Sequence, residues 1–231
     1  PGGAAHYVVV MSGGVLPSGV VTFVFTDVVG STDLWATDPA GMAESLELHD
    51  SILRETFDAA GGYVFTTAGD SFSVAFQEPS AAVEAVVKVQ AHLARTSWPG
   101  PGLEVRVGVH TATAVERDGD YFGTGVNTAA RIESAGHGGQ ILVSDAVVAP
   151  VDVDTLDLGT HRLRGIGEPV RLHQVGDRAH PPLRVASDVV VQLPACGWMS
   201  RFGGSTGVSG KMPSSGPNNS IPEYTSISPS T

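Results

Sequence analysis

The sequence has one cysteine, few basic residues and no long apolar run, and each of these features excludes a class of protein. Cys196 alone cannot build a disulfide framework, so a reducing compartment is expected. Lys and Arg number 13 against 24 Asp and Glu, and the net charge of −11 argues against a nucleic-acid-binding protein. No run reaches transmembrane length, and residues 1–14 lack the basic start of a signal peptide. We therefore expect a cytoplasmic protein that binds neither nucleic acid nor membrane.

Three regions of the chain differ in composition. Residues 1–17 are rich in glycine and weakly patterned, which predicts a flexible lead. Residues 18–176 carry the alternating and helical patterns of a folded domain, and hydrophobic residues make up 42% of the chain, enough for a packed core. Residues 177–231 indicate a linker followed by a disordered tail. Within that tail, 204–211 superficially suggests a phosphate loop but lacks its glycine spacing and a preceding strand.

The most informative stretch is Val20–Thr32. Its first seven residues are almost all β-branched or aromatic, which predicts a buried strand with the Asp27 carboxylate at its end. At Gly30 the backbone N–H groups can approach an anion closely, and Ser31 or Thr32 is expected to cap a helix that begins there. A carboxylate beside a helix start suits a divalent cation and a phosphate chain. The alternative is a capped turn with a solvated Asp.

Apolar periodicity gives the order of elements β-α-β-β-α-β, followed by further elements. This order is typical of an α+β fold, a ferredoxin-like βαββαβ sheet with extra C-terminal strands and with helices on one face. Residues 116–123 are expected to form a polar turn before the third helix. The predicted strands are 20–26, 63–67, 71–76, 103–110, 140–144, 156–163 and 170–175, and the predicted helices are 32–60, 80–95 and 125–135.

Two carboxylates are expected to converge at one end of this sheet. Asp27 ends the first strand, and Asp70 lies at the tip of the hairpin that this topology places beside it. Together they could hold two metal ions that bind the phosphates of a nucleotide and activate a hydroxyl group. Taken singly, each Asp has a plainer interpretation as a turn residue.

A third set of polar residues belongs to the helix predicted over 125–135. Asn127 and Arg131 are four positions apart and share a helical face, where an amide and a guanidinium would suit a ribose and a developing phosphoryl charge. Asp120, in the preceding turn, could accept a hydrogen bond from the amino group of adenine. The alternative is an exposed helix that follows an ordinary turn.

Four segments resemble, in order and spacing, the class III nucleotidyl cyclase catalytic domain, most closely its actinobacterial branch. The resemblance covers about residues 18–176 and implies a homodimer with active sites at the interface. Each site is implied to convert ATP to 3′,5′-cyclic AMP and pyrophosphate with two divalent metal ions, Mg²⁺ or Mn²⁺. The four segments are 25–32, 68–70, 105–111 and 119–131.

The resemblance also implies a role for each matching residue. One subunit would supply the metal ligands, and the partner would supply the transition-state residues. The implied residues are Asp27 and Asp70 for the metal ions, Asn127 and Arg131 for the transition state, and Asp120 for adenine. In the leading hypothesis the backbone amides of Gly30, Ser31 and Thr32 bind the phosphates.

Three basic residues of that family are replaced in this chain. Thr66 stands where a Lys reads adenine, and its hydroxyl can donate one hydrogen bond but lacks charge and reach. Thr113 replaces a phosphate-contacting Arg, and Ile166 replaces a late Lys for which Arg164 is a possible substitute. These departures predict weak turnover or loose base selection. The leading hypothesis is therefore an adenylate cyclase, and the alternative is a weak or inactive cyclase-like module that senses nucleotide or dimerises to regulate a partner.

Overall fold

The computed structural model describes residues 16–185, and its sheet is built around the first strand, β1 (Val20–Val28). The strand β1 pairs on one side with β3 (Ser71–Phe76) and on the other with β4 (Val105–Thr113), both antiparallel. β2 (Tyr63–Ala68) completes the order β2-β3-β1-β4. This order is that of a ferredoxin-like βαββαβ sheet, so the α+β prediction is confirmed.

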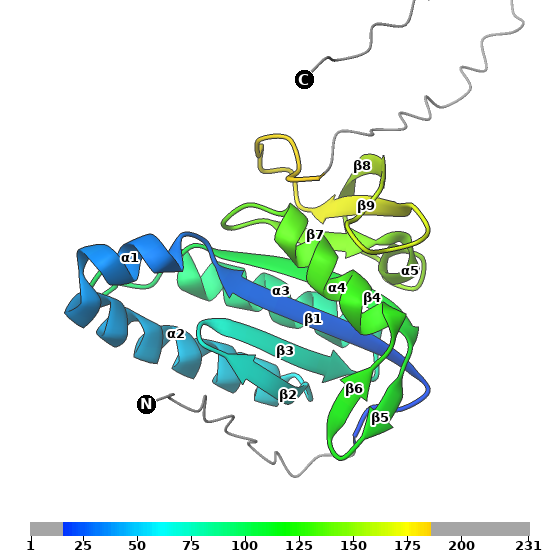
Figure 1. Ribbon diagram of the computed structural model, residues 1–231, viewed down its shortest axis with the longest axis horizontal. Coiled ribbons are helices and arrows are strands. Elements are labelled where there is room, and N and C mark those ends of the chain that lie inside the picture. The colour runs from blue at the N-terminus through cyan, green and yellow to red at the C-terminus, as the bar shows by residue number, and fades with distance from the viewer. Residues whose placement is uncertain (1–15, 186–231) are drawn as a thin grey trace, which may run out of the picture. The chain divides into compact units, whose positions relative to one another are not determined.

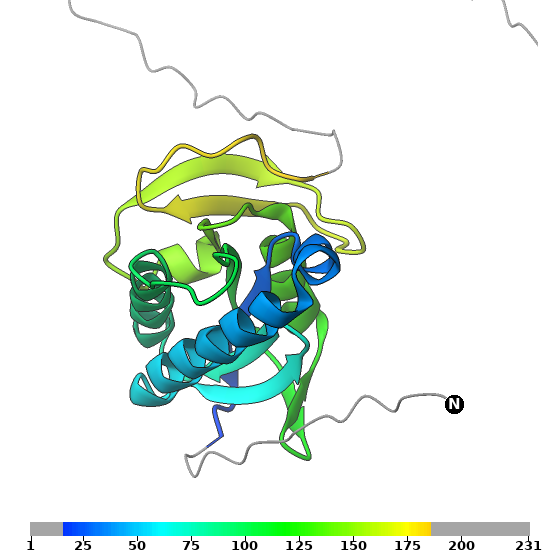
Figure 2. The ribbon, with the colours of Figure 1, turned by 90° about the vertical axis from the view of Figure 1, so that its left-hand side faces the viewer.

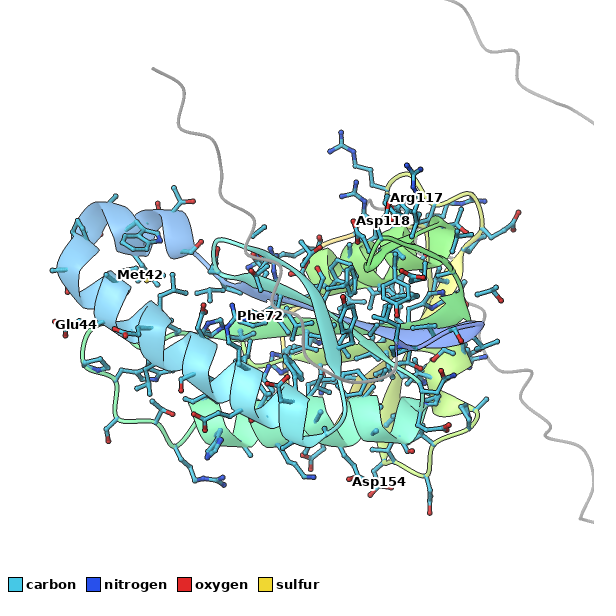
Figure 3. All side chains as sticks on the ribbon, turned by 90° about the horizontal axis from the view of Figure 1, so that it is seen from below. Met42, Glu44, Phe72, Arg117, Asp118 and Asp154 are labelled. Carbon is cyan, nitrogen blue, oxygen red and sulfur yellow. The ribbon has the colours of Figure 1, made fainter. Side chains whose placement is uncertain are left out.

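The two faces of β1 bury different side chains because successive residues of a strand point to opposite faces. Val24 and Val28 belong to the main core, together with apolar residues of α2 (Pro39–Ala59) and α3 (Pro79–Leu93). In Figure 3, Met42 of α2 and Phe72 of β3 mark this core, where both are fully buried. Val21 and Phe23 face a second, smaller cluster on the other side of the sheet.

The second face is partly covered by α4 (Thr124–Ala135), whose Ala129 lies in the smaller cluster. Figure 1 shows α4 in front of the sheet and α3 behind it. The two helices of the βαββαβ unit, α2 and α3, share one face as predicted, and the additional helix α4 covers the other face. Helical periodicity identifies an apolar stripe, but it does not say which face of a sheet that stripe will cover.

The predicted helix over 32–60 is two helices, α1 (Ser31–Thr37) and α2. They are separated at Asp38, whose φ of −142° and ψ of 80° are not helical. The cause is Pro39, which disfavours the helical region for the residue before it and which begins α2 at a position where no N–H is needed. Asp38 then caps α2 by accepting a hydrogen bond from the amide of Gly41 at 3.0 Å. Figure 2 shows how the chain turns between α1 and α2.

Three more strands extend the sheet beyond β4. β7 (Ile141–Ser144) pairs in parallel with β4, and β9 (Val170–Val175) and β8 (Thr155–His161) follow as an antiparallel hairpin. These are the extra C-terminal strands that the sequence predicts. A short helix, α5 (Asp145–Val148), follows β7 and was not predicted.

The predicted polar turn over 116–123 is a small hairpin of β5 (Val115–Arg117) and β6 (Asp120–Phe122). Its turn uses Asp118 and Gly119 at positive φ, as a tight hairpin turn requires. The hairpin is tied to β2 because Tyr63 donates a hydrogen bond to the carbonyl of Gly119 at 3.1 Å. Asp118 and its neighbour Arg117 are exposed, and both are labelled in Figure 3.

Residues next to both predicted domain boundaries contact the domain. Near the N-terminus, the hydroxyl of Tyr121 donates to the carbonyl of Pro17 at 2.7 Å. After β9, residues 177–185 pack back onto the end of α4, where the amide of Arg184 donates to the carbonyl of Ala135 at 2.9 Å and Leu183 joins the adjoining apolar cluster. These residues begin the predicted linker, and they contact the domain. Residues 1–15 of the predicted lead and 186–231 of the predicted tail, including 204–211, lie outside the described residues.

Candidate functional site

The structure brings Asp27 and Asp70 to the same end of the sheet. Asp70 lies at the turn between β2 and β3, and its Oδ2 accepts a hydrogen bond from the amide of Val28 at 3.2 Å. Ser71, the next residue, donates from its hydroxyl to Oδ1 of Asp27 at 2.8 Å. The two carboxylates therefore lie at the same end of the sheet, next to the end of β1, as the sequence predicts.

These carboxylates fit a divalent cation by the chemistry of their donor atoms. Oxygen ligands from Asp are those that Mg²⁺ and Mn²⁺ prefer, and the Asp27 side chain keeps 25% of its surface exposed. Mg²⁺ is commonly bound by one or two carboxylates together with substrate phosphates and water, so two protein ligands are compatible with such a site. Within residues 16–185, no group of three or more His, Cys, Asp or Glu side chains is arranged to hold a metal ion.

Arg106 and Glu133 adjoin this site and were not predicted. Arg106 lies opposite Asp27 in the pairing of β1 with β4, and its Nη2 donates to Oδ2 of Asp27 at 2.6 Å. Its Nε also lies 2.5 Å from Oε1 of Glu133, which belongs to α4. One guanidinium therefore contacts both a candidate metal ligand and a second carboxylate.

The Glu133 carboxyl group is buried, and only 9% of its side chain is exposed. Burial raises the pKa of Glu133 to about 7, because desolvation disfavours the charged form. The positive charge of Arg106 lowers this pKa, and the negative charge of Asp27 raises it. Sequence patterning could have indicated only that Glu133 falls on the apolar side of its helix.

Glycine allows α4 to approach the sheet closely. A Cβ atom on Gly108 of β4 would lie 2.2 Å from the backbone nitrogen of Glu133 and 2.7 Å from the carbonyl oxygen of Ala129. A Cβ atom on Gly125 would lie 2.4 Å from the Cβ of Ala112. The contact between α4 and β4 therefore depends on two positions without side chains.

Asn127 and Arg131 lie on the exposed side of α4, whereas Glu133 faces the sheet. A helix turns by about 100° per residue, so Arg131 is rotated by roughly 200° from Glu133 and points elsewhere. Within residues 16–185, no hydrogen bond or ion pair joins Asn127 or Arg131 to Asp27 or Asp70. The structure of one chain thus brings the two carboxylates together but does not bring the helix residues to them.

The loop after β1 differs in one respect from its prediction. Gly30 itself is the N-cap of α1, with φ of 74°, and no side chain makes a capping hydrogen bond. Ser31 and Thr32 are the first two residues of the helix, so the prediction that one of them caps it was wrong. Glycine adopts this left-handed conformation without the steric cost that a side chain would add.

Thr66 and Asp120 lie on strands that are tied together. Thr66 is a half-buried residue of β2, next to a bulge in its pairing with β3. Asp120 opens β6, and its Oδ1 accepts a hydrogen bond from the amide of Tyr121 at 2.7 Å. Tyr121 packs against Phe65 of β2, with ring centroids 5.1 Å apart. The two candidate base-reading residues are therefore chain neighbours of two aromatic residues that pack together.

The region between β8 and β9 contains the remaining candidates. Arg164 is exposed. Ile166 is half-buried and packs against the cluster that contains Leu163 and Leu172. The apolar side chain at position 166 therefore contributes to packing. The Arg164 side chain, by contrast, is exposed to solvent. Thr113, at the end of β4, is also exposed.

Comparisons of sequence and of structure both find that the chain is similar to nucleotide cyclases. The model of the family described as the adenylate and guanylate cyclase catalytic domain matches residues 15–171. The chain is 31% identical over 208 residues to the receptor-type adenylate cyclase GRESAG 4.3 of Trypanosoma brucei brucei, covering 69% of this chain and 17% of that protein. It is 39% identical over 158 residues to an adenylate cyclase of Mycosarcoma maydis, covering 57% and 6% respectively. The chain thus spans a minor part of the length of these relatives.

Two solved structures are similar to the whole described fold. One is of adenylate cyclases from Trypanosoma brucei in their monomeric state, with a TM-score of 0.69 and 30% identity over 75% of this chain and 98% of that chain. The other is the adenylyl cyclase CyaB from P. aeruginosa, with a TM-score of 0.61 and 26% identity over 70% of this chain and 95% of that chain.

Among residues 16–185, no helix combines the length and the hydropathy needed to cross a membrane.

Proposed function

Because the chain belongs to the adenylate and guanylate cyclase catalytic domain family, we propose that it is an adenylate cyclase that converts ATP to 3′,5′-cyclic AMP and pyrophosphate. The observation that carries this proposal is the placement of Asp27 and Asp70 at the same end of the sheet, next to the end of β1. Relatives named adenylate cyclase support the choice of ATP. The actinobacterial branch, the cytoplasmic location and the absence of membrane and nucleic-acid partners remain predictions.

In this proposal Asp27 and Asp70 hold two divalent cations, Mg²⁺ or Mn²⁺. When bound, the cations neutralise the triphosphate and lower the pKa of the attacking hydroxyl group. The backbone at Gly30, Ser31 and Thr32 lies beside the phosphates. The ribose 3′-oxygen would attack the α-phosphorus as its proton passes to water, and the bond to the β-phosphate oxygen would break with its electron pair kept by pyrophosphate.

The other roles fall to residues on the opposite side of the bound nucleotide. Asn127 orients the ribose, and Arg131 stabilises the charge that develops on the α-phosphate. Asp120 accepts a hydrogen bond from the adenine amino group, and Thr66 donates one to the ring. Arg164 contributes positive charge toward the phosphates in place of the Lys that Ile166 replaces.

We propose that each active site is shared by two copies of the chain. Asn127 and Arg131 are exposed on α4 and are rotated away from the face that carries Glu133, next to Arg106 and Asp27. A second copy related by twofold symmetry could present the same helix to the carboxylates of the first, and the reverse contact would form the second site. A homodimer would thus bring Asn127 and Arg131 of one copy to Asp27 and Asp70 of the other.

The first test is an assay of cyclic nucleotide formed from ATP or GTP with Mn²⁺ or Mg²⁺. Asp27→Ala should reduce cyclic AMP formation at least 100-fold, because one of two charged ligands is lost. Asp58→Ala, which removes an exposed Asp on α2, should leave activity unchanged. Equal activity of the Asp27→Ala and unchanged proteins would refute the assignment.

The second test mixes Asp27→Ala protein with Arg131→Ala protein. Random exchange should make about half of the dimers mixed, each with one intact site, so about a quarter of the unmutated activity should return. No recovery from variants that are each folded and dimeric would exclude the shared site.

The alternative function is a cyclase-like module that binds nucleotide with little turnover and regulates a partner. The observation that favours it is Ile166, which packs into an apolar cluster where a catalytic Lys would be expected from the family resemblance. Binding of ATP without any cyclic product, measured in the first assay with added equilibrium dialysis, would favour this function over catalysis.

A further inference from the structure

The side chain of Arg106 connects the candidate metal site to a buried carboxylate that the proposed mechanism does not use. Its Nη2 and Nε lie 2.6 and 3.2 Å from Oδ2 of Asp27, and its Nη1 donates to the carbonyl of Ser134 at 3.4 Å. Oε1 of Glu133 lies 2.5 Å from the same Nε, so both carboxylates contact this guanidinium at once. We call Asp27, Arg106 and Glu133 the arginine bridge.

The hydrogen bonds that Arg106 donates to Asp27 oppose the binding of a metal ion to that carboxylate. Arg106 engages Oδ2, and Ser71 engages Oδ1, so both oxygens of the ligand already accept hydrogen bonds. A divalent cation on this carboxylate would face the positive guanidinium at close range, and like charges repel strongly where water is partly excluded. The Arg106 side chain is only 19% exposed, so solvent screens this repulsion weakly.

Glu133 provides a second position for the same guanidinium. Its Oε1 is buried, and although Nε of Arg106 lies within ion-pair distance, the contact is not aligned as a hydrogen bond. A buried acceptor without an aligned donor is costly, so a rotation of the guanidinium that aims an N–H group at Oε1 would satisfy it. Oε1 of Glu133 can thus accept a hydrogen bond from the Arg106 guanidinium when Arg106 releases Asp27.

We propose that Arg106 and Glu133 are positioning residues for the divalent cation. Arg106 holds the Asp27 carboxylate in place before the cation binds, and Glu133 takes up the guanidinium once the cation occupies Asp27. This inference rests on the proposed function, since it requires Asp27 to be a metal ligand. It predicts effects of opposite sign for the two residues, which a purely structural tie between α4 and β4 would not produce.

The experiment measures binding of Mn²⁺ alone to the nucleotide-free protein at pH 8, by the electron paramagnetic resonance signal of free Mn²⁺. Glu133→Gln leaves Arg106 with Asp27 as its one carboxylate and should weaken Mn²⁺ binding about tenfold, within the range of coupling between contacting charges. Arg106→Gln removes the competing charge and should strengthen binding by a similar factor. Asp157→Asn, which breaks the exposed pair with Arg171, is the control and should change nothing.

The outcomes separate this inference from the proposed function. If Asp27→Ala binds Mn²⁺ as well as the unchanged protein, the metal assignment fails and the inference fails with it. If Asp27→Ala loses binding while Glu133→Gln and Arg106→Gln shift affinity in the same direction or not at all, the inference alone is overturned. Circular dichroism spectra establish that each variant is folded, and if one of the two bridge variants does not fold, the sign of the other decides.

Discussion

Replacing Gly108 by Ala tests the closest approach between a helix and the sheet. The new Cβ atom would lie 2.2 Å from the backbone nitrogen of Glu133, whereas ordinary contacts begin at 3.4 Å. Its nearest neighbours are backbone atoms of α4, so no side chain can rotate to make room. The helix would have to move away from β4 by about 1.2 Å, which would loosen the packing of Ala129 and Ile132, both fully buried.

The expected loss of stability is about 3 kcal/mol, the upper end of the range for overpacking in a rigid core. Ala is otherwise the better residue in a strand by about 0.5–1 kcal/mol, so a loss must come from the clash. The melting temperature should fall by roughly 6–12 °C for a domain of this size.

Urea unfolding followed by far-ultraviolet circular dichroism would measure this difference. The matched control is Gly167→Ala, because a Cβ atom there has no neighbour within 4 Å and the backbone does not have positive φ. The control should lie within about 0.5 kcal/mol of the unchanged protein. If Gly108→Ala is as stable as Gly167→Ala, then the close approach of α4 to β4 is not as described.

Three further substitutions have expected results. The pKa of Glu133 is near 7 in the folded protein and 4.5 in the unfolded chain, so folding favours its protonated form and the free energy of unfolding should fall by at most about 3 kcal/mol as pH rises from 4.5 through 7. Glu133→Gln should flatten this pH dependence in urea titrations at several pH values, and equal slopes for the two proteins would contradict the assignment. Thr66→Lys should lower the KM for ATP about tenfold, because a charged donor replaces a hydroxyl at the adenine, and an unchanged KM would place Thr66 away from the base. Asp38→Ala should cost about 1 kcal/mol in thermal unfolding through loss of the cap on the Gly41 amide, and no change would show that the cap contributes nothing.

Local sequence patterns were sufficient for the centre of this fold. The β-branched run of β1 and the hairpin around Asp70 follow from period-two alternation and turn residues, and the βαββ order then places Asp70 beside Asp27. The apolar periodicity continues across Pro39 and so predicts one helix, but the proline separates α1 from α2. The roles of Asn127, Arg131, Asp120, Thr66 and Arg164 remain predictions.

The sequence by itself determined most of the strands and helices, because those choices depend on residues close together in the chain. Only the tertiary structure decided that Arg106 contacts both Asp27 and Glu133. The first contact depends on the register between β1 and β4, which joins residues far apart in sequence. The second depends on how closely α4 docks over Gly108, a distance set by packing rather than by any local pattern.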